Sequence, residues 1–188
     1  MLALAFCAGQ AAAQAAPPPP DTLKVDYFTY ANTTDAPDAT LHLTNPGTTG
    51  GNVCAAIFVF DSIEELSECC SCSLSPNDLR TLSVNHDLTS NPLVRTLQTG
   101  SISIVSTATT DGVCPLPTVL NPTSGGVRAW ATHIDRVRFG PLVGYVESTA
   151  ASQDATLSST EENELAFACD ALYIDGSGYG ICSCGTGE

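Results

Sequence analysis

Cysteine is the residue type in this chain with the widest chemistry, because a thiol can form a disulfide, bind a metal or act as a nucleophile. The 188 residues contain nine cysteines, and Cys7 lies in an apolar N-terminal segment that we expect to be cleaved. Its removal leaves an even number of cysteines, as a disulfide framework requires. The disulfide candidates are Cys54, Cys69, Cys70, Cys72, Cys114, Cys169, Cys182 and Cys184.

The pairing of these cysteines is only partly constrained by their spacing. Eight cysteines allow on the order of a hundred connectivities, and the sequence does not choose among them. Cys69 and Cys70 are adjacent, and since a bond between neighbours strains the peptide, each is expected to have a distant partner. The two Cys-Ser-Cys elements, 70–72 and 182–184, would place both sulfurs on one face if extended. Two parallel cross-links between them would suit that arrangement.

Metal binding and redox exchange are alternatives for the same sulfurs. A Cys-Ser-Cys element beside another cysteine resembles a thiolate site for zinc or cuprous copper. Only Cys69 and Cys72 have the Cys-x2-Cys spacing of structural zinc sites, and Cys70 lies between them. Redox exchange needs a cation or a helix N-terminus to lower a thiol pKa, whereas the surroundings here are acidic. We therefore expect structural disulfides and no cofactor, with an extracellular metal-binding protein as the first alternative.

Histidine and serine chemistry gives a second alternative, a small secreted hydrolase. The chain has three histidines, His42, His86 and His133. Asp87 and Asp135 follow two of them closely in sequence, which does not establish contact. A triad also needs an activated nucleophile, and Ser124 in Thr-Ser-Gly-Gly only faintly resembles a serine-protease motif because no acid precedes it. We expect solvated histidines, no catalytic residues and no enzymatic activity.

The acidic residues favour solvent exposure over metal binding. They cluster at Glu64, Glu65 and Glu68 and again at Glu161, Glu162 and Glu164. Both clusters fall on predicted helices, where Glu64 and Glu68 would form an i, i+4 solvent face, whereas calcium needs oxygen ligands that converge from a loop. Trp130, which alternates with alanines, is expected to be a large buried aromatic of the core.

The net charge restricts the partners. Twenty acids face six bases, for a formal charge of −14, and Lys24 is the only lysine. Nucleic acid is an unsuitable partner because phosphate binding needs a basic patch, and anionic lipid would repel the chain. Nothing in the composition suggests a membrane span, because the apolar N-terminal run is too short and too rich in alanine to cross a bilayer.

The N-terminal segment predicts export. Residues 1–16 form an apolar run that ends in small residues, typical of a signal peptide, and residues 17–22 begin with four prolines that would form a stiff arm. We expect residues 23–188 to form one disulfide-stabilised domain, secreted to an extracellular or periplasmic compartment where disulfides persist.

Periodicity predicts the elements that position these residues. Alternation or continuous apolar character indicates strands at 24–30, 40–44, 53–60, 100–107, 127–133 and 138–147, with frequent turn signals between them. Ser62 and Glu65 have the spacing of a capping box and predict a short helix that carries Cys69 and Cys70; Ser159 and Glu162 predict another, ending at a left-handed Gly176. The pattern is that of a mainly β protein, an antiparallel β-sandwich of the Ig-like or Greek-key type. We expect one or two short helices and a disulfide-rich C-terminal hairpin.

Four segments, 58–61, 68–72, 88–93 and 176–182, resemble uncharacterised exported cysteine-rich proteins of environmental bacteria. The resemblance implies export and disulfides, and no activity. We therefore expect a secreted or cell-surface structural or adhesive module. It would act as an assembly or fibre subunit that pairs with itself through strand edges or its N-terminal arm.

Overall fold

The computed structural model describes residues 21–123, 125–176 and 179–185. The expected signal segment and residues 17–20 of the proline-rich arm lie outside the described residues. The last two residues of that arm belong to the folded body, because Thr22 is fully buried and its carbonyl accepts the Ser106 N–H.

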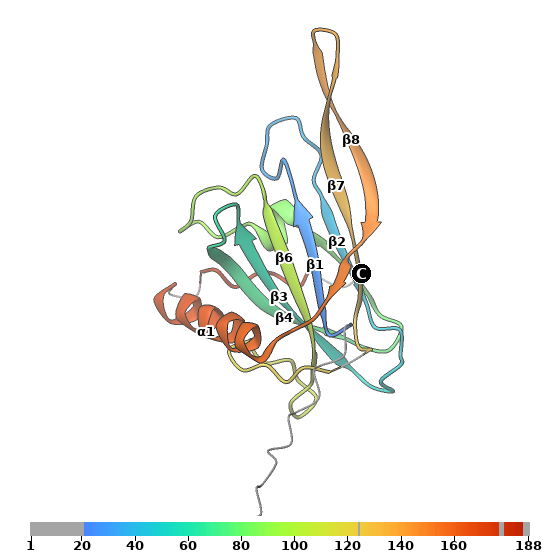
Figure 1. Ribbon diagram of the computed structural model, residues 1–188, viewed down its shortest axis with the longest axis vertical. Helices are drawn as coiled ribbons and strands as arrows, with labels where there is room; N and C mark the ends of the chain where they lie inside the picture. The colour runs from blue at the N-terminus through green and yellow to red at the C-terminus, as the bar shows by residue number, and fades with distance from the viewer. Residues whose placement is uncertain (1–20, 124, 177–178, 186–188) are drawn as a thin grey trace, which may run out of the picture.

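Two antiparallel sheets form the body (Figure 1). Sheet A has the strand order β4-β3-β6-β1-β9, and sheet B has the order β5-β2-β7-β8. The strands of sheet A are β1 (Leu23–Phe28), β3 (Val53–Asp61), β4 (Leu66–Leu74), β6 (Gly100–Ala108) and β9 (Gln153–Ala155). Those of sheet B are β2 (Thr40–Thr44), β5 (Leu79–Ser83), β7 (Arg128–Phe139) and β8 (Leu142–Ala151). This arrangement confirms the predicted mainly β, sandwich-like fold.

Sheet A is the middle layer of three. Its inner face packs against sheet B through a core that includes Ile57 and Ile104, and its outer face packs against α1 (Ser159–Asp175) through Phe58 and Val105. Because β3 is covered on both sides, it reads as a continuous apolar run, as predicted. A second, five-residue helix, η1 (Val84–Leu88), follows β5.

The predicted helix over the first cysteine cluster is wrong, because that segment is strand β4. Asp61 caps a tight turn there instead: its Oδ1 accepts the N–H groups of Ile63 and Glu65. Glu64 takes a left-handed φ of 68° in this turn, and the chain then returns antiparallel to β3. A strand places Cys69 and Cys70 on opposite faces of the sheet, which a helix would not do.

Helix α1 is present close to where the sequence predicts it. Its N-cap is Ser158, one residue earlier than expected, whose Oγ accepts the Glu161 N–H. Gly176 follows the helix with φ −78°, so the predicted left-handed cap is wrong. A Cβ at Gly176 would lie 2.5 Å from the carbonyl oxygens of Leu172 and Tyr179. Glycine is therefore required there for the close approach of the backbone.

The C-terminal segment, residues 179–185, closes the open side of the sandwich between β4 and β5. Ile181 bridges Cys69 in parallel, and the Arg80 Nη1 donates to the Gly185 carbonyl at 3.4 Å. The disulfides of the predicted C-terminal hairpin are present, but residues 179–185 form a single segment laid along β4 and not a hairpin. Across the described chain, neither helix combines the length and the apolar character needed to cross a membrane.

Candidate functional site

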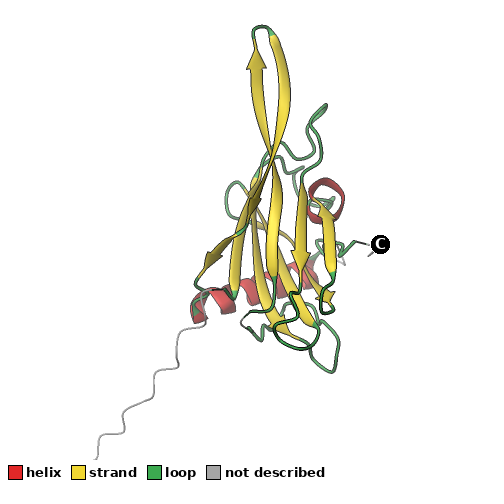
Figure 2. Cartoon of the chain, turned by 90° about the vertical axis from the view of Figure 1, so that its right-hand side faces the viewer, coloured by secondary structure: helices red, strands yellow, loops and turns green. Residues whose placement is uncertain are grey.

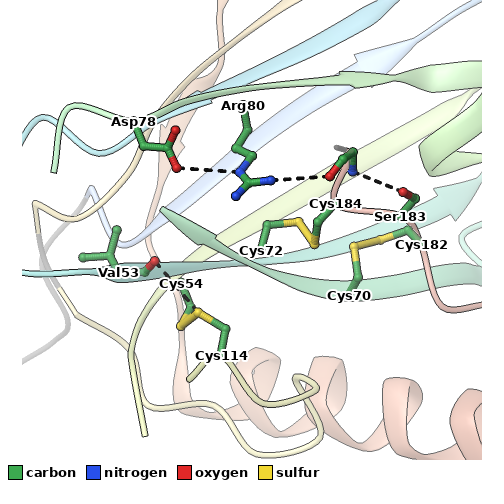
Figure 3. Close-up of a disulfide and its surroundings, with 11 residues drawn as sticks. Val53, Cys54, Cys70, Cys72, Asp78, Arg80, Cys114, Cys182, Ser183 and Cys184 are labelled. Carbon is green, nitrogen blue, oxygen red and sulfur yellow. Dashed lines mark hydrogen bonds and ion pairs between the residues drawn. A yellow bond between two sulfur atoms is a disulfide. The ribbon is translucent and has the colours of Figure 1, made fainter. Parts of the chain in front are cut away.

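All eight candidate cysteines are joined in four disulfides. The pairs are Cys54–Cys114, Cys69–Cys169, Cys70–Cys182 and Cys72–Cys184. Three of them start from β4, and Figure 3 shows two of these, Cys70–Cys182 and Cys72–Cys184, side by side. The expected parallel cross-links between the two Cys-Ser-Cys elements are therefore confirmed.

Strand β4 is fixed from both faces. Cys69 points outward to Cys169 of α1, whereas Cys70 and Cys72 point inward to the C-terminal segment. Backbone hydrogen bonds support the same contact, because the Cys69 N–H donates to the Gly180 carbonyl and the Cys182 N–H donates to the Cys69 carbonyl. An edge strand is thus covered on its free side and bonded to α1 on one face and to the C-terminal segment on the other, which removes it as a site for pairing with another chain.

The sulfurs of Cys70, Cys72 and Cys184 lie within 4.8 Å of one another, which is close enough for a shared metal ion. Each of them is nevertheless bonded to another sulfur. A thiolate is the form that ligates zinc or copper, so both disulfides would have to be reduced before this cluster could bind either metal. The arrangement fits cross-linking better than metal binding.

A serine, an aspartate and a histidine do meet, at the junction of the two sheets. The Asp26 carboxylate accepts the Ser152 hydroxyl at 2.6 Å, and its Oδ1 lies 3.3 Å from His133 Nε2. Asp26 and His133 are both buried. In a catalytic triad the histidine lies between acid and serine, whereas here the aspartate lies between them. The serine therefore lacks the histidine contact of a triad, and the group joins the sheets instead.

His42 lies on the outer face of sheet B, as expected, but it is not fully solvated. Its Nδ1 lies 3.0 Å from the Thr81 hydroxyl and its Nε2 lies 3.1 Å from the Thr40 hydroxyl. Burial lowers the pKa of His42 below 6.5. The ring stacks on Trp130 with centroids 5.2 Å apart. The prediction that Trp130 anchors the core is wrong, because Ala129 and Ala131 face inward and Trp130 is half-buried outside.

The remaining hydrolase candidates do not converge. His86 is exposed in η1, and the Asp87 carboxylate caps that helix by accepting the Ser83 N–H at 2.8 Å. Asp135, which is close to His133 in sequence, is exposed and is not its partner. Ser124 lies outside the described residues.

Glu68 is a buried acid that the sequence does not reveal. It was expected on a solvent face, yet in β4 it is 1% exposed. Burial raises the pKa of Glu68 to about 7, although N–H donors from Asn91 and Ser90 act in the opposite direction. Its Oε1 accepts the Asn91 N–H, and no group in the described chain bonds its Oε2. Its role is to hold the loop after η1 against β4.

Other acids of the two predicted clusters line a groove of about 460 Å³ between α1 and the outer face of sheet A. Glu64 comes from the β3–β4 turn, and Glu161 and Glu164 come from α1. Apolar side chains, Phe60 and Leu165 among them, form the rest of the wall. Helix α1 as a whole carries five acids and no base.

The longest strands form a hairpin that leaves the body. Figures 1 and 2 show β7 and β8 rising well beyond the other strands to the Gly140–Pro141 turn. Four large apolar side chains near its end are 43–69% exposed, namely Phe139, Leu142, Val143 and Val146. The tip, residues 136–143, carries Arg136 and Arg138 and no acid. Strand β8 is also the unpaired edge of sheet B.

No family model matches the chain, and no significant match was found among curated proteins or solved structures. The resemblance to uncharacterised exported proteins stays a prediction.

Proposed function

We propose that this chain is an exported, non-enzymatic structural module that assembles through its β7–β8 hairpin. The observation that carries the proposal is the contrast between a cross-linked body and an unpartnered hairpin. A hairpin that exposes Phe139, Leu142 and Val143 away from the core buries little apolar surface in the monomer. Exposed apolar groups of this kind mark interaction sites.

The disulfides support an exported location. Such bonds form and persist outside the cytoplasm, and reducing compartments keep thiols free. Three of the four bonds close loops of 100 to 112 residues, which restricts the unfolded chain strongly. A body fixed in this way suits a protein that must endure outside the cell.

The polar groups support a structural role over catalysis. Asp26, Ser152 and His133 connect the two sheets, and both nitrogens of His42 face threonine hydroxyls. Each group thus has a structural task.

Sedimentation velocity of the oxidised chain, from micromolar to submillimolar concentration, tests the proposal. We expect concentration-dependent association for the unaltered chain. The variant F139S/L142S removes two exposed apolar side chains at the hairpin tip and should remain monomeric, whereas V113S/V119S removes two that lie elsewhere on the surface and should associate normally. A chain that is monomeric at every concentration, examined also by electron microscopy, would contradict the proposal.

A further inference from the structure

We propose that the hairpin tip binds the acidic groove beside α1 of a second copy of this chain. The inference rests on the proposed function and specifies the partner surface. Two features suit one contact: a basic, apolar tip on the hairpin and an acidic, partly apolar groove beside α1. Figure 1 shows the hairpin rising from the body and α1 lying against the side of the body.

The charges of the two surfaces are complementary, and they form no ion pairs within the described chain. Arg136 and Arg138 are exposed, and neither forms an ion pair with any described residue. The groove glutamates, Glu64, Glu161 and Glu164, also lack ion pairs within the described chain. A tip with two positive charges is exceptional on a chain of net charge −14. Opposite charges placed in this way steer partners together and suppress wrong orientations.

The apolar parts of the two surfaces are also matched. Phe139 is 66% exposed and Leu142 is 69% exposed at the tip. The groove of about 460 Å³ offers Phe60, Leu165 and Ala168 between its glutamates. Arg136 and Arg138 lie on one face of β7, and Phe139 and Leu142 lie on the other. A tip inserted end-on would therefore place its apolar face against one wall of the groove and its arginines against the other. Aromatic and arginine side chains are enriched at interface hot spots. The guanidinium groups would then lie toward the groove's carboxylates.

The contact cannot form within one molecule, because the hairpin points away from α1 in both views (Figures 1 and 2). It is heterologous, since different surfaces of two copies meet. Such contacts produce rings when the rotation closes and open filaments when it does not. The free groove of each bound copy remains able to accept another tip.

A charge-exchange experiment on the full oxidised chain tests the pairing. The hairpin variant R136E/R138E and the groove variant E64R/E164R should each lose association by at least tenfold. An equimolar mixture of the two should recover it with a one-to-one composition, because each tip then finds a groove of opposite charge. One chain carrying all four changes should also associate. High salt should weaken both the unaltered and the exchanged pairs.

The matched control is D170R/D175R, which makes the same charge change on α1 outside the groove and should leave association intact. Near-ultraviolet circular dichroism and the mass before and after reduction verify that each variant folds with four disulfides. The inference is overturned if the chain associates but the exchange fails to restore assembly, or if the hairpin variant assembles normally, as pairing along the β8 edge would allow. Hairpin-dependent binding to phosphatidylglycerol vesicles without groove dependence would overturn it as well. A monomeric unaltered chain would instead remove the proposed function itself.

Discussion

Cys69 and Cys70 are neighbours in β4, yet they are bonded to segments on opposite faces of sheet A: Cys69 to α1 and Cys70 to the C-terminal segment. The alternation of a strand makes this possible, because successive side chains point to opposite faces. One short strand therefore ties both α1 and the C-terminal segment to sheet A. The contribution of each disulfide to stability depends on the loops that the other disulfides already close.

The first prediction concerns the Cys72–Cys184 disulfide. With Cys70–Cys182 intact, it closes a loop of only a few residues, so the variant C72S/C184S should lose about 2 kcal/mol of unfolding free energy. Cys54–Cys114 stands apart from the others and closes 60 residues, so the variant C54S/C114S should lose about 4 kcal/mol. Guanidinium unfolding of both variants measures the difference. Equal losses of unfolding free energy in the two variants would show that Cys70–Cys182 and Cys72–Cys184 act independently.

The second prediction concerns Glu68, whose pKa burial raises from 4.5 to about 7. Between these two values the folded chain binds a proton that the unfolded chain releases, so the contribution of Glu68 to stability is complete below about pH 4.5 and is lost as the pH rises through about 7. The loss is of the order of 3 kcal/mol. Urea unfolding across this range should show that Glu68→Gln is less sensitive to pH than the unaltered chain.

Glu65→Gln is the control for this measurement, because Glu65 is exposed only three residues away and carries the same charge. This control also accounts for repulsion among the many acids of the chain, which lowers the stability of the folded state as the pH rises. If both variants follow the unaltered chain, Glu68 is ionised in the folded protein at neutral pH.

The third prediction concerns Asp26, which accepts hydrogen bonds from Ser152 and from the Tyr27 N–H and contacts His133. Asp26→Ala leaves the buried His133 and two part-buried donors without this partner and should cost about 3 kcal/mol. Ser152→Ala removes one bond and should cost about 1 kcal/mol. Denaturant unfolding tests this order. The exposed Asp135→Ala should be nearly neutral, and a similar cost at Asp135 would contradict the assignment of Asp26 as the partner of His133.

The fourth prediction uses Trp130, the only tryptophan, as a reporter of His42. A charged imidazolium quenches an adjacent indole more strongly than a neutral ring does. Since burial lowers the pKa of His42, fluorescence should fall with acidification through a midpoint below 6.5. His42→Gln should abolish the transition and His86→Gln should preserve it. A midpoint above 6.5 would show that His42 is not desolvated.

The alternation of apolar and polar residues along the sequence was sufficient to predict much of the fold. Leu41 and Leu43 alternate with polar residues in β2 and are fully buried, and the uninterrupted apolar run of β3 lies between two layers. In both cases local pattern and tertiary environment agree.

Strand β4 shows where local pattern is insufficient. The residues just before β4 have the sequence pattern of a helix cap. In the structure Asp61 caps a turn there and not a helix. Pairing with β3 and three disulfides then decide the conformation beyond Leu66. Local preference is weak beside such tertiary contacts.

Trp130 and Glu68 were misplaced for a different reason. Alternation divides a strand into two faces without stating which is inside, and β7 turns its alanines inward. The partners of buried polar groups are equally hidden, because they come from distant segments: Asn91 lies 23 residues from Glu68 and Ser152 lies 126 residues from Asp26. No periodicity in one segment encodes such a contact.

The position of β4 in the chain has a consequence for biosynthesis. Its three cysteines are made 100 to 112 residues before their partners, which at ordinary translation rates is a delay of about 5 to 20 s. During that time the nearest earlier thiol is Cys54, whose own partner, Cys114, also comes later. Once Cys114 is made, Cys54 can close its native bond, but until Cys169 is made the three β4 cysteines can close only incorrect bonds. We therefore expect a thiol–disulfide isomerase to speed maturation of a chain that meets an oxidant in this interval.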